Sequence, residues 1–65
     1  MKTISQYKED IAALMKKVAD IDARCITDNR EITNQELGIK TEMLDGVEEL
    51  RRIVASMERH ERLMV

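Results

Sequence analysis

The chain has 65 residues, so it forms one domain at most, and a domain of that length buries only a small core. It contains no Phe, Trp or Pro and a single aromatic residue, Tyr7, while Ile, Leu, Val, Met and Ala supply nearly all of its apolar side chains. This composition is typical of long amphipathic helices and argues against a β-sheet, which needs more aromatic residues and turns.

The charge balance argues against a nucleic-acid-binding protein, and the short apolar runs argue against a membrane protein. Eleven Lys and Arg residues nearly cancel thirteen Asp and Glu residues, for a net charge of -2, so we expect no binding to nucleic acid. The longest apolar run, residues 11–15, is far too short to cross a bilayer, and residues after Met1 lack the profile of a signal peptide. One cysteine, Cys25, fits a reducing compartment, so we expect a cytosolic protein without membrane contact.

The first predicted element is a helix over about residues 2–27. Its apolar residues are spaced alternately three and four apart, which is the heptad pattern of a helix that packs along one seam against another helix. These residues are Ile4, Tyr7, Ile11, Leu14, Val18, Ile21 and Cys25.

A turn is predicted over about residues 28–33, where short polar side chains compete for backbone hydrogen bonds. The next helix has a complete start signal. Thr33 is the expected N-cap, and Glu36, three residues later, completes a capping box. Ile32 and Leu37 are spaced as a hydrophobic staple across the helix start. We therefore interpret this segment as a turn and helix cap, and we do not expect it to bind a ligand.

The second predicted helix covers about residues 34–64. Its seam is formed by Met43, Val47, Leu50, Val54, Met57 and Met64. Lys40 and Glu61 interrupt this seam near its ends. Four further residues, Leu37, Ile39, Leu44 and Ile53, widen the apolar stripe, and a broad stripe indicates more than one neighbouring helix.

The two helices predict an all-α fold, in which residues 1–65 form a single antiparallel helical hairpin with heptad-type seams. A hairpin alone has only one interface, so we expect copies to assemble into a helical bundle or coiled-coil oligomer. The residues expected to form the oligomer interface are Ile4, Tyr7, Ile11, Leu14, Val18, Ile21, Leu44, Val47, Leu50, Val54 and Met57.

No residue pattern predicts catalysis, a cofactor or a metal site. His60 is the only histidine, and a metal site needs three or four convergent ligands. Cys25 lies on the seam and is interpreted as a small buried apolar residue, because a cysteine nucleophile needs a histidine partner. We therefore expect that the chain is not an enzyme.

The two helices, the junction DNREITNQE at residues 28–36 and the charged end LRRIVASMERHERL at residues 50–63 together resemble a known family. They are similar to the N-terminal scaffolding, or delta, region of tailed-bacteriophage major capsid proteins. In that family a segment like Asn-Arg-x-Leu-Thr-x-x-Glu-Glu separates two coiled-coil helices. The matching residues here are Asn29, Arg30, Thr33 and Glu36. Ile32 replaces the more usual Leu, and Leu37 replaces the second acid. The resemblance covers nearly the whole chain.

The resemblance implies a segment that precedes a shell-forming fold, projects into the immature capsid and clusters the subunits during assembly. Its implied partners are other copies of itself, the capsid shell domain and a maturation protease that later removes it. The chain is then expected in the bacterial cytoplasm and inside the immature capsid, as a fragment of a larger capsid protein or as a separately encoded scaffold.

Two other functions remain open. A small regulatory adaptor or antitoxin-like hairpin could cover the groove of a partner protein with a methionine-rich stripe made by Met43, Met57 and Met64. A DNA-binding helical dimer would use the arginines of residues 51–62, but the acids around them argue against it.

Overall fold

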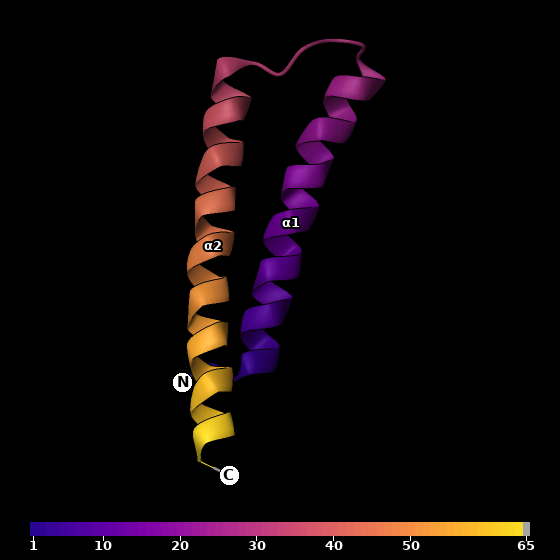
Figure 1. Ribbon diagram of the computed structural model, residues 1–65. Helices are drawn as coiled ribbons and strands as arrows, with labels where there is room; N and C mark the ends of the chain where they lie inside the picture. Colours follow the sequence, from indigo (N-terminus) through magenta and orange to yellow (C-terminus); the bar gives the residue numbers. More distant parts are fainter. Residues whose placement is uncertain (65) are drawn as a thin grey trace.

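The computed structural model describes residues 1–64, which form two α-helices and no strand: α1 (Ile4–Thr27) and α2 (Asn34–Leu63). The helices run antiparallel, with the connecting turn at one end and both termini at the other (Figure 1). The molecule is a rod of 52 × 17 × 17 Å. The predicted all-α, two-helix hairpin is confirmed.

Helix α1 begins at Ile4, two residues later than the sequence pattern predicted. The reason is a capping box that we did not anticipate. The backbone amide of Gln6 donates to the Thr3 hydroxyl oxygen at 3.1 Å, and the backbone amide of Thr3 donates to the side-chain oxygen of Gln6 at 2.8 Å. These bonds satisfy amides that have no partner within the helix, so Thr3 stays outside it in an extended conformation.

Helix α1 ends in a Schellman motif. Asn29 has a left-handed backbone with φ of 50°, which turns the chain out of the helix. The Arg30 amide then donates to the Cys25 carbonyl at 3.0 Å, and the Asn29 amide donates to the Ile26 carbonyl at 3.1 Å. Asn is one of the few residues other than Gly that adopts this conformation at low cost, which explains why the helix stops here.

The core is a single seam between the helices. Among residues 1–64, four side chains are buried: Val18, Ile21, Val47 and Val54. Met64, which was also predicted for the seam, is 73% exposed because it lies at the C-cap of α2, beyond the reach of α1. The other seam residues are half-buried: Ile4, Tyr7, Ile11, Leu14, Cys25, Met43, Leu50 and Met57. In a hairpin each helix has only the other helix to cover it, so burial follows the heptad pattern and fades to either side. Helix α2 ends at Leu63, one residue before its predicted end, with Met64 as its C-cap.

The two glycines within α2 differ in their surroundings. A Cβ atom built on Gly46 would lie 3.5 Å from Cδ1 of Leu14, which is an ordinary van der Waals contact. A Cβ on Gly38 would meet nothing within 4 Å. Gly46 therefore faces α1 but leaves room for a methyl group, and Gly38 has no packing role within the hairpin.

Asn29 should be replaceable by Gly but not by Ala. We expect Asn29→Ala to lower the free energy of unfolding by about 1 kcal/mol, because a Cβ without a compensating polar group disfavours the left-handed backbone. Asn29→Gly should be neutral or stabilising. Thermal unfolding followed by circular dichroism measures both. Asn34→Ala is the matched control, since Asn34 lies in the first turn of α2 and tolerates Ala. Equal destabilisation by Asn29→Gly and Asn29→Ala would contradict this account of the turn.

Candidate interaction surface

The predicted oligomer interface lies mostly inside the hairpin. Of the predicted interface residues, all except Leu44 are buried or half-buried in the seam between α1 and α2. Leu44 keeps 37% of its surface exposed. Contacts with another copy of a folded hairpin must therefore use side chains beside the seam. Apolar residues beside the seam are exposed to solvent in this structure.

Two ion pairs connect the helices and fix their register. The Lys40 ammonium lies 2.8 and 3.1 Å from the two carboxylate oxygens of Asp22. Near the termini, the Lys8 ammonium lies 3.6 Å from Glu58. Lys40 interrupts the seam of α2, so its pairing with α1 explains how a charge is accommodated there. The Lys40 pair is partly buried and the Lys8 pair is more exposed. Ion pairs that remain in contact with water add little stability, but these two favour this alignment of the helices over others.

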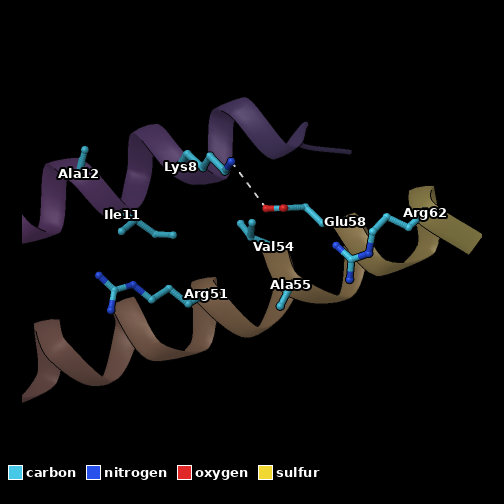
Figure 2. A pocket seen from close by; sticks show the side chains of 8 residues that line it. All are labelled: Lys8, Ile11, Ala12, Arg51, Val54, Ala55, Glu58 and Arg62. Atoms are coloured by element: carbon cyan, nitrogen blue, oxygen red, sulfur yellow. Dashed lines mark ion pairs between the residues drawn. The ribbon is translucent and has the colours of Figure 1, made fainter.

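An open groove runs between the helices near the termini (Figure 2). Its volume is about 490 Å³. Its apolar lining is Ile11, Ala12, Val54 and Ala55. The charged groups that border it are Lys8, Arg51, Glu58 and Arg62. The groove exists because Ala12 and Ala55 are too small to fill the space beside the seam. Three cationic side chains and one anionic side chain surround the groove. It therefore suits an apolar side chain that has acidic residues near it.

Exposed apolar side chains continue along the same side of the hairpin towards the turn. Ile26 follows Lys8 by eighteen residues, and Leu37 precedes Ala55 by eighteen. Eighteen residues are about five helical turns, so each pair shares one side of its helix. Met15 and Leu44 lie one heptad from Lys8 and Arg51 and share the same sides.

We call this surface the apolar face. Its members are Ala12, Met15, Ala19, Ile26, Leu37, Leu44 and Ala55. The exposed fractions of its large residues are 38% for Met15, 80% for Ile26, 48% for Leu37 and 37% for Leu44. Exposed apolar residues are common singly, but a row along both helices is a surface suited to association. Ile39, also exposed, lies in a different groove with Ile21 and Met43.

The turn is held by the side chain of Arg30. Its guanidinium donates to both carboxylate oxygens of Glu36 at 2.7 and 3.0 Å, and to the Glu31 carbonyl at 3.2 Å. It also lies 3.3 Å from Asp28 and 3.6 Å from the Cys25 sulfur. Two parallel bonds to one carboxylate are a strong and directional contact. Arg30 therefore ties the end of α1 to the first turn of α2.

Glu36 also caps α2, as its spacing from Thr33 predicts. The Thr33 amide donates to the Glu36 carboxylate at 3.0 Å, and the Glu36 amide donates to the Thr33 hydroxyl at 3.1 Å. The Arg30 guanidinium and then the Thr33 amide lower the pKa of Glu36 from 4.5 to about 2. The same contact raises the pKa of Arg30. Ile32 is half-buried, whereas Leu37 stays on the apolar face.

The sequence pattern did not reveal the role of Arg30. An arginine six residues before the capping Glu36 is the signal that could have found it, because the turn brings the two side chains together. The resemblance had included Arg30 only as a matching position.

The groups considered for chemistry lie apart. His60 is exposed near the end of α2, and Cys25 is half-buried at the end of α1. Within residues 1–64, no three His, Cys, Asp or Glu side chains are placed to hold a metal ion. Neither helix among the described residues is long and apolar enough to cross a membrane.

Comparison with protein-family models, curated proteins and solved structures found no match for this chain. The hairpin, the apolar face and the residue chemistry therefore carry the functional argument.

The Glu36 carboxylate should make stability depend on acid pH. Because its pKa is about 2 when folded and 4.5 ordinarily, its contribution is complete above about pH 4.5 and is lost as pH falls towards 2. We expect Glu36→Gln and Arg30→Gln to reduce the fall in melting temperature between pH 4.5 and 2. Circular dichroism melts at several pH values measure this.

Glu31→Gln is the control for the loss of one acid from the same turn, because the Glu31 side chain takes no part in the Arg30 contacts described above. This variant should keep the fall seen in the unmodified chain. If Glu36→Gln also kept that fall in full, the contact between Arg30 and Glu36 would not contribute to stability in solution.

Proposed function

We propose that this chain is an assembly domain, which brings copies of itself together through coiled-coil contacts. The observation that carries the proposal is the uncovered apolar face beside a seam in which, among residues 1–64, four side chains are buried. A short chain with one helix interface leaves a narrow margin over the entropy of ordering its residues. Covering the apolar face with further helices adds the burial that the hairpin lacks.

The proposed setting is the immature capsid of a tailed bacteriophage, where the hairpin acts as the scaffolding region of the major capsid protein. The four residues that carry this resemblance all work in the turn. Asn29 adopts the left-handed conformation, Arg30 contacts Glu36, and Thr33 caps α2. In this chain these residues therefore close the hairpin and start its second helix. The proposed partners are other copies, the capsid shell domain and a maturation protease.

A marginal hairpin suits such a role. Weak contacts between single hairpins allow wrongly placed subunits to separate, while many hairpins held close together inside a shell reach a high effective concentration. Once the hairpins are removed, the shell no longer depends on them. An assembly domain needs no catalytic group, and the proposal assigns none to His60 or Cys25.

We expect the chain to gain mass with concentration. Sedimentation equilibrium over micromolar to millimolar protein, with helicity followed by circular dichroism, should show mass and helix rising together because folding is coupled to association. Replacing Leu14 and Leu50 with Asp should abolish both signals, since these residues pack in the seam. Fusing the chain to a monomeric carrier protein should make the carrier oligomeric.

A stable helical monomer at every concentration would overturn the assembly proposal. That result would favour the alternative, an adaptor or antitoxin-like hairpin whose apolar face covers a partner's groove. In that case the carrier fusion would stay monomeric until the partner was added.

A further inference from the structure

The apolar face carries a projection at one end and a groove at the other. Ile26, the most exposed large apolar residue within α1, lies near the turn. The groove beside Ala12 and Ala55 opens near the termini. Its volume of about 490 Å³ leaves ample room for a branched aliphatic side chain. The projection of one copy meets the groove of a second copy only when the two copies run in opposite directions.

The spacing of the face places the symmetry axis of such a pair. Ala19 lies midway between Ala12 and Ile26, and Leu44 lies midway between Leu37 and Arg51. A two-fold axis that crosses the helices at Ala19 and Leu44 places Ile26 of each copy over Ala12 of the other. It also places Leu37 over the stem of Arg51. Every contact away from the axis is then made twice, as a two-fold interface requires.

Charge favours the same direction. Residues 20–43, at the turn end, carry three Lys or Arg and six Asp or Glu, for a net charge of -3. Residues 1–18 and 45–64 carry eight Lys or Arg and seven Asp or Glu, for a net charge of +1. Opposed copies place the acidic end of one beside the basic end of the other. Parallel copies would place two acidic ends together, which is unfavourable.

One charged pair is specific to this register. The axis at Leu44 places Lys40 of one copy opposite Glu48 of the other, because both lie four residues from it. Lys40 already contacts Asp22 in its own chain, so Glu48 would join an existing ion pair. The side of the rod that carries the apolar face is large enough for a stable contact. The whole side measures 52 by 17 Å, or roughly 900 Å², and each partner in a stable complex buries roughly 800 Å².

We propose that a second copy of this chain covers the apolar face in the opposite direction, with Ile26 of each copy in the groove beside Ala12 and Ala55 of the other. The product is a four-helix bundle in which all neighbouring helices are antiparallel. This proposal rests on the proposed self-association and adds its surface, direction and register.

Cross-linking tests the direction. In a Cys25→Ser background, chains with Ala12→Cys are mixed equally with chains bearing Ile26→Cys in a glutathione redox buffer, so that disulfide exchange reaches equilibrium. We expect the mixed disulfide to exceed both symmetric disulfides together by at least about fivefold, because only the opposed pair brings these positions into contact. Mass spectrometry counts the three products. Ala13→Cys replaces Ala12→Cys as control, since it lies about 100° away around the helix.

The outcomes separate the two proposals. Predominantly symmetric Ile26→Cys disulfides would show parallel copies and overturn the direction, while self-association would stand. Equal cross-linking through Ala13→Cys would overturn the choice of face. If sedimentation showed a monomer throughout, both proposals would fall together.

A substitution tests the role of Ile26 itself. Ile26→Asp should weaken dimerisation at least about tenfold, because the change acts at two symmetric contacts. Leu63→Asp is the matched control, for Leu63 is 73% exposed and lies on another side of α2. Sedimentation equilibrium gives both dissociation constants. Equal weakening by the two variants would mean that added charge alone acts, and the proposed contact of Ile26 would be wrong.

Discussion

The structure depends on a geometric limit: each of two packed helices can cover only the side of the other that it faces. The seam that meets this limit runs the whole length of the hairpin and contains the four buried residues. Anything apolar outside that side stays in contact with water unless a third element covers it. Met15, Leu37 and Leu44 lie just beyond the limit, which is why they remain partly exposed although they continue the apolar pattern. The hairpin is therefore a complete fold, but part of its apolar surface remains in contact with water.

The turn decides which sides meet. A change in the length or direction of the connection would rotate one helix against the other and change the paired stripes. Asn29 turns the chain out of α1, and the Arg30 contact with Glu36 holds the start of α2 beside that point. The cost of fixing a long arginine side chain is offset by its two parallel bonds and by the helix cap that Glu36 makes at the same time. Farther along α2, the ion pair between Lys40 and Asp22 favours the same alignment of the two helices.

The helical pattern predicted the seam and both helices, because a row of apolar residues spaced three and four apart has only one structural interpretation at this length. It did not separate the apolar residues that pack within the hairpin from those that remain for contacts between copies. Leu14 and Val54 are predicted for the oligomer interface, and the structure packs both in the seam between α1 and α2. The periodic spacing shows that one side of a helix is covered, but it does not show how many helices share in covering it. The role of Arg30 was missed for a related reason, since a side chain that reaches across a turn leaves no periodic trace.

The uneven charge along the rod gives the hairpin a direction that its apolar residues alone would not impose. Leucine and isoleucine rows pack almost equally well in either direction, so hydrophobic burial supplies affinity but little orientation. In the proposed pair, orientation comes from the acidic turn end and the basic terminal end, together with the unlike shapes of Ile26 and its groove. An opposed pair brings the termini of its two chains to opposite ends of a bundle about as long as one hairpin. Domains joined to the two chains at these termini would then lie about one hairpin length apart.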